Sequence, residues 1–241
     1  MADELHDGPL AGRIAYVTGS SRGIGAATAQ ALAAAGAHVL LSGRSASDLE
    51  AVEDAIHQAG GTATIAPFDL TEGDSIARLA GAVAERWDRL DILVLNAAML
   101  PQLGPVAQIE SKAFNQALTI NLLAPQALLA AFDPLLRRSP SGRVIALTSS
   151  VATAPRAYWG AYAASKAALE VLVDTYGQEV ERISGTRVAI LDPGATRTTM
   201  RARAFPGEDP QGVKPPEAVA DRIVALLAED FPNHHRERVD G

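Results

Sequence analysis

A tyrosine and a lysine four positions apart could transfer a proton. Tyr162 and Lys166 are the first and last residues of the segment Tyr-Ala-Ala-Ser-Lys, in a stretch that predicts a helix. A spacing of four places both side chains on one helix face. A free phenol, with a pKa of about 10, is a poor base near neutral pH, and a nearby cation lowers this pKa. The pair therefore predicts a proton-transfer site, although such a pair alone is also typical of a solvated helix face.

A glycine-rich turn follows the first apolar segment of the chain. It reads Thr-Gly-Ser-Ser-Arg-Gly-Ile-Gly over residues 18–25 and precedes an alanine-rich stretch. Glycine lets the pyrophosphate of a dinucleotide approach the backbone, and the amino end of the following helix presents free N–H groups to the anion. The motif predicts a nucleotide-binding turn, with an ordinary strand-to-helix turn as the alternative. Its candidate cofactor contacts are Gly19, Ser21, Arg22, Gly23, Ile24 and Gly25.

The residues after the second apolar segment indicate which dinucleotide would bind. Sites that prefer NAD usually carry an acid here, which accepts a hydrogen bond from the ribose 2′-hydroxyl. This chain reads Leu-Ser-Gly-Arg over residues 41–44, without an acid. Arg44, joined by Arg22, could bind a 2′-phosphate through charge-assisted hydrogen bonds. The sequence favours NADP(H), and NAD(H) stays open if both arginines are simply exposed.

Short apolar segments alternate with longer amphipathic segments along the chain. Six of the short segments predict strands: Ile14–Thr18, His38–Ser42, Thr62–Phe68, Asp91–Leu95, Arg143–Thr148 and Arg187–Leu191. Helices are predicted near residues 23–35, 46–59, 73–87, 111–137, 157–183 and 215–229. This alternation predicts parallel strands joined by right-handed helical crossovers, and the uninterrupted apolar runs are typical of strands buried on both faces.

These elements predict a single α/β domain over residues 1–241. We expect a Rossmann-type doubly wound parallel sheet with helices on both faces, in three αβα layers. No obvious linker divides the chain, and the segment at about 199–216 is rich in Pro, Gly and charge. Because this segment follows the sixth strand, it predicts a substrate loop over the carboxyl ends of the strands. Whether His235–Asp240 adds a seventh, edge strand is left open.

The composition argues against several other classes of function. The chain has 241 residues, 48% of them hydrophobic, and a formal charge of −7, which disfavours nucleic acid as a partner. The absence of cysteine excludes disulfides, thiolate metal sites and cysteine nucleophiles. Gly23–Gly43 carries no charge, but its alanines suit a helix leading into a buried strand better than a membrane span. Without a recognisable secretory signal, we expect a cytoplasmic protein with no metal or membrane partner.

Together with further motifs along the chain, the glycine-rich turn and the Tyr162/Lys166 pair resemble the short-chain dehydrogenase/reductase superfamily in order and spacing. The single-domain branch of about 250 residues has a similar length, and bacterial oxidoreductases related to 3-oxoacyl-thioester reductases are the nearest likeness. The resemblance rests on the turn at 18–25, the Tyr162/Lys166 pair, a serine thirteen positions before the tyrosine, Thr-Ile-Asn-Leu at 119–122, Asp-Pro-Gly at 192–194 and Asp-Leu at 69–70.

The resemblance implies a role for each matching residue. The catalytic set would be Asn121, Ser149, Tyr162 and Lys166, with Ser149 and Tyr162 donating hydrogen bonds to a carbonyl beside nicotinamide C4 and Asn121 fixing a water that relays protons to Lys166. The further cofactor contacts would be Asp69, Leu70, Asn96, Ala97, Pro193, Gly194, Thr196 and Thr198, with Tyr162 and Lys166 touching the cofactor as well. One departure is Ala98, which stands where the family pattern has glycine.

Two functions are consistent with these motifs. The first is an NADP(H)-dependent oxidoreductase that interconverts a small-molecule carbonyl and a secondary alcohol. The alternative is a regulatory protein that uses the same fold to bind a dinucleotide without turnover, since fold alone does not decide function. The resemblance also implies a homodimer or homotetramer formed through the two long helices that contain Asn121 and Tyr162.

Overall fold

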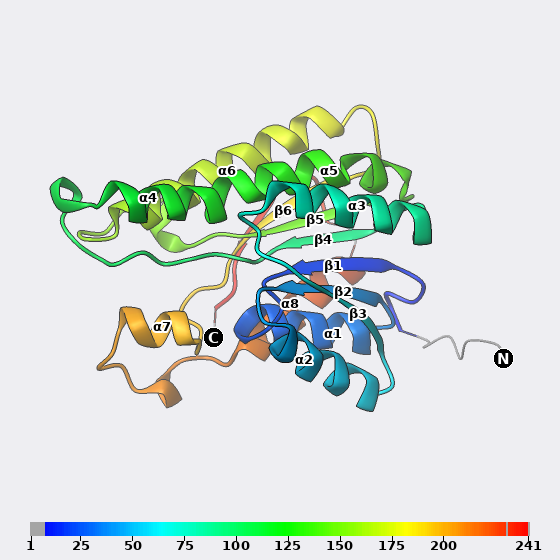
Figure 1. Cartoon of the computed structure of the whole chain (residues 1–241), viewed down its shortest axis with the longest axis horizontal. Coiled ribbons are helices and arrows are strands. Elements are labelled where there is room, and N and C mark those ends of the chain that lie inside the picture. The colour runs from blue at the N-terminus through cyan, green and yellow to red at the C-terminus, as the bar shows by residue number, and fades with distance from the viewer. Residues whose placement is uncertain (1–7, 230, 241) are drawn as a thin grey trace.

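The described residues, 8–229 and 231–240 of a computed structural model, form a seven-stranded sheet with helices on both faces (Figure 1). The strands are β1 (Ile14–Thr18), β2 (His38–Gly43), β3 (Thr62–Pro67), β4 (Ile92–Leu95), β5 (Arg143–Leu147), β6 (Arg187–Asp192) and β7 (His235–Arg238). They lie in the order β3-β2-β1-β4-β5-β6-β7, and all neighbouring pairs are parallel. The predicted doubly wound sheet is confirmed.

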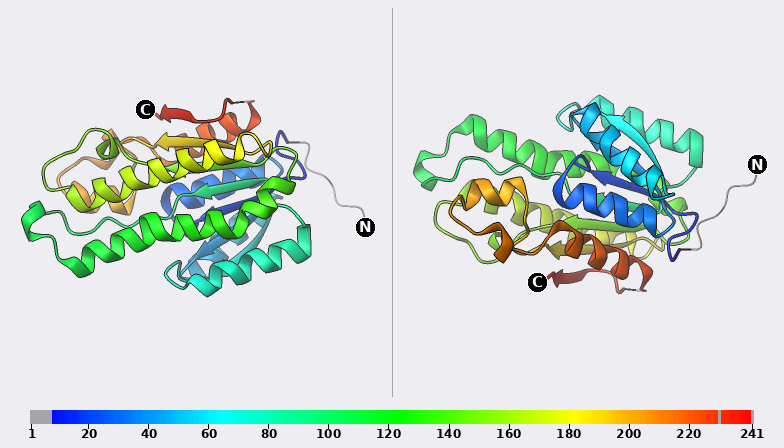
Figure 2. Two further views of the ribbon diagram at one scale, coloured as in Figure 1. Left: turned by 90° about the horizontal axis from the view of Figure 1, so that it is seen from above. Right: turned by 90° about the horizontal axis from the view of Figure 1, so that it is seen from below.

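The helices form two layers that enclose the sheet. They are α1 (Gly23–Ala34), α2 (Ala46–Gln58), α3 (Gly73–Trp87), α4 (Ser111–Leu118), α5 (Ala124–Arg138), α6 (Gly160–Val180), α7 (Thr199–Ala204) and α8 (Pro216–Ala228). Short turns of helix lie at η1 (Val106–Gln108), η2 (Thr119–Leu123), η3 (Ser150–Ala152) and η4 (Pro210–Gly212). Figures 1 and 2 show α1, α2 and α8 on one side of the sheet and α3, α5 and α6 on the other.

Burial on both faces explains the uninterrupted apolar strands. In β1, Ala15 and Val17 belong to the core beneath α1, α2 and α8, whereas Tyr16 belongs to the core beneath α3, α5 and α6. In β4, Val94 and Leu95 face these same two cores in turn. Because both faces are covered, no position of a central strand needs a polar side chain.

The chain reverses its direction of travel across the sheet between β1 and β4. From β1 it runs through β2 to β3, and it then returns to place β4 on the other side of β1. In open parallel sheets of this kind, ligands bind beyond the carboxyl ends of the strands at such a point. The glycine-rich turn after β1 and the loops after β4, β5 and β6 therefore meet at one edge.

Three local differences from the predicted elements affect this edge. The predicted helix at 111–137 is divided into α4, the π-helical segment η2 and α5. The predicted loop at about 199–216 contains the short helix α7. The C-terminal segment left open by the sequence forms β7, which pairs with β6.

The helical run Ser111–Arg138 is long and apolar enough to span a membrane by length and composition alone. The side chains of Leu128, Phe132 and Leu135 within it are buried in the core beneath α3, α5 and α6. Packing of this helix on the sheet accounts for its apolar composition.

Candidate active site

Helix α6 carries Tyr162 and Lys166 to the carboxyl end of β5. Both are buried, with exposed fractions of 7% and 2%. The Lys166 ammonium donates a hydrogen bond to the carbonyl oxygen of Leu147, the last residue of β5, at 2.8 Å. The predicted pair therefore lies at the edge of the sheet where this class of fold binds its ligands.

The pKa of Tyr162 differs from the sequence-based expectation. Burial, assisted by the Asp192 carboxylate, raises the pKa of the phenol above its ordinary value. Burial also lowers the pKa of Lys166 to about 8, against the opposing effect of Glu170. The prediction of a lowered pKa for Tyr162 is wrong in this structure, because burial and the Asp192 carboxylate both disfavour the phenolate. At neutral pH, Tyr162 is protonated and is able to donate.

Ser149 lies two residues after the end of β5 and immediately precedes the turn η3. Its backbone is extended, with φ −160° and ψ 149°, and η3 packs against α6. Within the described residues, neither the Ser149 hydroxyl nor the Tyr162 hydroxyl bonds to the protein. Both hydroxyl groups are therefore available to a third group.

Asn121 lies in η2 and is completely buried. Its Oδ1 accepts from the Met99 N–H at 2.8 Å, and its Nδ2 donates to the Met99 carbonyl at 3.0 Å and to the Ser165 Oγ at 2.9 Å. Pro125, near the start of α5, has no N–H to give to the Asn121 carbonyl, which favours a widened helical turn. The side chain of Asn121 thus ties the loop after β4 to the residue preceding Lys166.

Two glycines of the turn after β1 are constrained, Gly25 by space and Gly19 by its positive φ and a close neighbour. A Cβ at Gly25 would lie 2.2 Å from the Gly19 carbonyl oxygen and 2.5 Å from the Asn96 Nδ2. Gly19 has φ +64°, and a Cβ there would lie 3.0 Å from the Cα of Ala97. The Asn96 Nδ2 donates to the carbonyls of Thr18 and Gly19, at 2.8 and 3.1 Å. This geometry fits a turn that presents its backbone to a pyrophosphate.

Hydrogen bonds to Thr18 connect Asn96 and Ala97 to the start of the glycine-rich turn. The Thr18 Oγ1 accepts from the N–H groups of both residues at 3.0 Å, and it donates to the Val94 carbonyl at 3.2 Å. The side chain of Asn96 is therefore used to hold the turn. Ala98, the departure from the family pattern, follows these two residues in the same extended loop.

Arg22 and Arg44 are exposed beside the same turn. A Cβ at Gly43 would lie 3.4 Å from the Cβ of Ser21, so the glycine-rich turn lies against the end of β2 just before Arg44. Neither arginine has an ion pair within the described residues. Two unneutralised cations at this position suit a 2′-phosphate.

Apart from Ile24 in α1, the remaining predicted cofactor residues lie after β3 and β6. The Asp69 Oδ1 accepts from the N–H and hydroxyl of Thr71, both at 2.9 Å, and Leu70 packs on the core. The Gly194 N–H, at φ +60°, donates to the Asp192 Oδ1 at 2.9 Å. Ile24, also predicted to contact the cofactor, packs partly against the core beneath α1.

The segment from Pro193 to Thr198 approaches the glycine-rich turn. The Thr196 hydroxyl donates to the Pro193 carbonyl at 2.9 Å, so it stabilises the bend. The Thr198 hydroxyl caps α7 by accepting from the Arg201 N–H at 3.1 Å. A Cβ at Gly23 would lie 3.4 Å from the Cγ2 of Thr198, which shows that this segment and the turn are neighbours.

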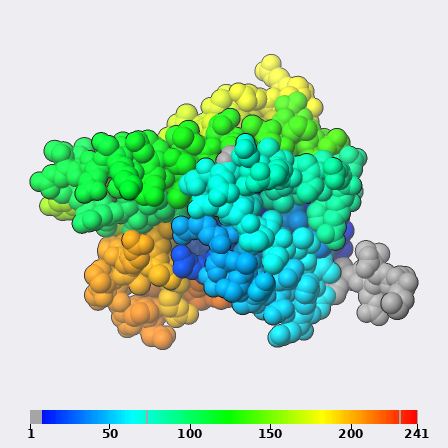
Figure 3. Space-filling model, viewed as in Figure 1, coloured from blue at the N-terminus to red at the C-terminus, as the bar shows by residue number. Residues whose placement is uncertain are grey.

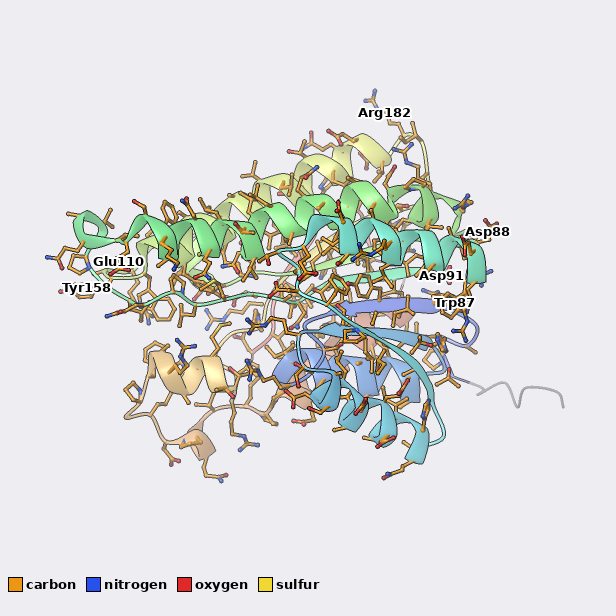
Figure 4. All side chains as sticks on the ribbon, viewed as in Figure 1. Trp87, Asp88, Asp91, Glu110, Tyr158 and Arg182 are labelled. Carbon is orange, nitrogen blue, oxygen red and sulfur yellow. The ribbon has the colours of Figure 1, made fainter. Side chains whose placement is uncertain are left out.

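Apolar and aromatic side chains surround Tyr162. Leu100, Val151 and Ala163 are buried with it, and Met200 from α7 packs against the group. The Trp159 ring lies 6.0 Å from the Tyr162 ring, between centroids. In Figure 4, Tyr158 lies near Glu110 at the opposite end of the molecule from Trp87, Asp88 and Asp91. Tyr158 is exposed and is not among the residues that pack in this apolar group.

The segment after α7 adds a second aromatic ring to this cover. The Phe205 ring lies 5.7 Å from the Trp159 ring. The Arg201 guanidinium lies 3.7 Å from the centroid of Phe205 and donates two hydrogen bonds to Glu208. In Figure 3 this segment, in orange, borders the place where blue residues from the start of the chain reach the surface. The predicted substrate loop is thus held in an ordered conformation.

The hydroxyls of Ser149 and Tyr162, the buried Lys166 ammonium and the glycine-rich turn lie at the carboxyl end of a doubly wound sheet. Residues 13–209 match the family model for short chain dehydrogenases. This chain belongs to the short-chain dehydrogenase family.

Known members of the short-chain dehydrogenase family are similar over nearly the whole chain. The oxidoreductase YciK of Escherichia coli strain K12 is 36% identical over 225 residues, which cover 90% of this chain and 87% of the relative. The structure of a Pseudomonas syringae short chain dehydrogenase has a TM-score of 0.94 at 36% identity and covers 100% of this chain and 99% of its own. A Shigella flexneri 2a member, complexed with NADP, has a TM-score of 0.90 at 34% identity, with 95% and 97% covered.

Sequence reasoning missed the stacking of Trp159 with Phe205 and the position of Glu170. Trp159 and Phe205 are far apart in the sequence, so only the folded chain shows that they stack. Glu170 is an acidic residue within a largely apolar helix, and its position four residues after Lys166 was the available signal.

Proposed function

We propose that this chain is an NADP(H)-dependent oxidoreductase that interconverts a carbonyl and a secondary alcohol, with Tyr162 as the general acid and base. The observation that carries the proposal is that the buried Lys166 ammonium is bonded to the last residue of β5, while Tyr162 on the same helix and Ser149 two residues after β5 have hydroxyls without a bond among the described residues. Binding of a dinucleotide alone would not require a serine–tyrosine pair of donors. Hydrogen-bond donors placed where negative charge develops are what a carbonyl reduction needs.

In the reducing direction, Ser149 and Tyr162 donate hydrogen bonds to the substrate carbonyl oxygen. NADPH, when bound, supplies the hydride to the carbonyl carbon. Tyr162 then gives its proton to the developing alkoxide, so the product leaves as an alcohol. The Lys166 ammonium stabilises the phenolate that remains and holds the ribose hydroxyls of the dinucleotide. Asn121 holds the Ser165 hydroxyl, next to Lys166 on α6, and would fix the water that family resemblance implies.

The surroundings of Tyr162 favour a substrate with an apolar carbon skeleton next to its carbonyl group. Any carbonyl that reaches the Tyr162 oxygen comes into contact with the residues packed around it. These include Val151, Trp159 and Met200, and none of their side chains is charged. Apolar pockets with a few convergent polar groups bind small molecules in this manner.

Arg44→Ala tests the choice of cofactor. We expect the affinity for NADPH to fall by about 10- to 100-fold, because a charge-assisted hydrogen bond to phosphate contributes about 1.5–3 kcal/mol. The affinity for NADH should change little, since NADH has no 2′-phosphate. Fluorescence titrations with both dinucleotides measure the difference, and Arg182→Ala, an exposed arginine in the turn after α6, is the matched control. Equal losses for the two dinucleotides would refute the assignment of Arg44.

The alternative function is a regulatory protein that binds a dinucleotide without turnover. A titration with NADPH followed by a screen of ketones, diketones and aldehydes separates the two functions. The proposal predicts binding and oxidation of NADPH that depends on at least one of these carbonyl compounds. Tight binding with no oxidation on any member of the panel would favour the regulatory function.

We further propose that the chain acts in the cytoplasm as a homodimer or homotetramer on a small-molecule substrate, without nucleic acid or membrane. Leu123 in η2 and Val171 in α6 are apolar yet 55% and 67% exposed, which supports burial of these helices against another copy. Light scattering should give a mass of two or four chains. A monomer at working concentration would contradict this assembly.

A further inference from the structure

Glu170 is a buried carboxylate on the same face of α6 as the catalytic pair. It lies four residues after Lys166 and eight after Tyr162, and it is 7% exposed. Its Oε1 accepts from the Thr148 hydroxyl at 2.5 Å, and its Oε2 accepts from the Arg236 Nη1 at 2.6 Å. A buried charge is costly unless it is paired and hydrogen-bonded, and both carboxylate oxygens here have partners.

These two partners, Thr148 and Arg236, connect Glu170 to the end of β5 and to β7. Thr148 lies between Leu147, whose carbonyl accepts from Lys166, and Ser149. The Glu170–Thr148 bond therefore fixes the strand end that carries Ser149 to the helix that carries Tyr162. Arg236 belongs to β7, so the last strand of the sheet holds the carboxylate from the other side.

We propose that Glu170 is a positioning residue. Its negative charge keeps Lys166 protonated, and its bond to Thr148 fixes the position of Ser149 relative to Tyr162. This inference rests on the proposed function, because it concerns the same reaction. Arg236 opposes the first effect, since its guanidinium neutralises part of the charge that Lys166 experiences. The edge strand β7 thus adjusts a catalytic group that it does not touch.

Other ionisable groups lie near this cluster. Asp192, at the end of β6, faces Tyr162 and contributes to its raised pKa. Arg236 also pairs with Asp174, and the Asp174 Oδ1 lies 3.5 Å from the Nδ1 of His234. Both test variants, Glu170→Gln and Arg236→Gln, leave Asp192, Asp174 and His234 unchanged.

Glu170→Gln and Arg236→Gln are expected to act in opposite directions. The carboxylate raises the pKa of Lys166, which burial lowers to about 8. An opposite charge nearby favours the protonated amine. Without the carboxylate, the pH at which kcat decreases on the alkaline side should therefore be about one unit lower. Without the Arg236 cation, the negative charge of Glu170 is no longer partly neutralised and stabilises protonated Lys166 more strongly. The pH at which kcat decreases on the alkaline side should then be higher. If the Glu170–Arg236 ion pair had only a structural role, the two variants would not displace the pH profile of kcat in opposite directions.

A second readout does not depend on turnover. The chain contains three lysines, at 112, 166 and 214, so selective ¹³C labelling of the lysine ε-carbon gives a spectrum that can be assigned with Lys112→Arg and Lys214→Arg. The NMR titration of Lys166 should show the same opposite displacements. Glu179→Gln, an exposed residue on α6, is the control that should leave Lys166 unchanged.

The outcomes separate this inference from the proposed function. Opposite displacements in the NMR titration support the role of Glu170, and coincident titrations in wild type and both variants overturn it. Absence of turnover in a wild-type protein that shows those displacements would contradict the proposed function alone. If circular dichroism shows that Glu170→Gln is unfolded, Arg236→Gln decides: a displacement to higher pH supports the inference, and an unchanged titration overturns it.

Discussion

Tyr162→Phe is expected to lower kcat for carbonyl reduction by about 10²- to 10⁴-fold, the range that general acid catalysis contributes. The substitution removes one oxygen atom and leaves the ring, so the contact with Trp159 and the packing with Val151 should persist. The affinity for NADPH should therefore stay close to that of wild type. Steady-state kinetics with a carbonyl substrate, combined with a fluorescence titration of NADPH, measure both quantities.

Tyr158→Phe is the matched control for this change. Tyr158 is 61% exposed, lies in the same segment and is not part of the apolar group around Tyr162. Its loss of a hydroxyl should leave kcat and NADPH affinity unaltered. If Tyr162→Phe retained a kcat comparable to that of the control, Tyr162 would not be the proton donor.

Gly25→Ala is expected to damage the phosphate turn. The added methyl group would meet the Gly19 carbonyl oxygen at 2.2 Å and the Asn96 Nδ2 at 2.5 Å, so the turn must move. Overpacking of this kind costs about 1–3 kcal/mol, and we expect a loss of that size in the free energy of unfolding. Because the Gly19 carbonyl and the Asn96 amide hold the turn in shape, NADPH affinity should also fall by about tenfold or more.

Gly81→Ala is the control for the added methyl group. Gly81 lies in α3, where a Cβ would meet no atom within 4 Å. Alanine in a helix is more stable than glycine by about 0.8–1.0 kcal/mol, so this variant should be slightly stabilised and should bind NADPH as wild type does. Thermal unfolding and NADPH titrations compare the two variants. Wild-type affinity in a folded Gly25→Ala protein would show that the turn does not contact the dinucleotide.

The strands could be predicted from sequence because burial on both faces leaves a plain signal. Six apolar runs gave β1 to β6 with ends that differ by one residue at most. The seventh strand reads His-Arg-Glu-Arg and gives no apolar signal, since it lies at the edge of the sheet. Its charged side chains form ion pairs instead, as when Glu237 binds Arg222 on α8. Charged edge strands are common because they discourage pairing with other chains.

The site was predictable where spacing along one element determines position, and less so where separate segments meet. The spacing of Tyr162 and Lys166 on one helix was sufficient to predict that they share a face. The widened turn at Asn121 had one visible cause, Pro125, but its bonds to Met99 and Ser165 depend on tertiary packing. The pKa of Tyr162 was predicted with the wrong sign, because the sequence shows a nearby lysine but does not show the extent of burial.

Transfer of deuterium from labelled NADPH tests the central claim most directly. NADPH that carries deuterium at both positions of nicotinamide C4 is incubated with the protein and a panel of carbonyl compounds, and the products are analysed by mass spectrometry and NMR. The proposed function predicts deuterium on the carbinol carbon of at least one alcohol product with the wild-type protein, and a greatly reduced yield with Tyr162→Phe. Saturating NADPH binding without label in any product would contradict it.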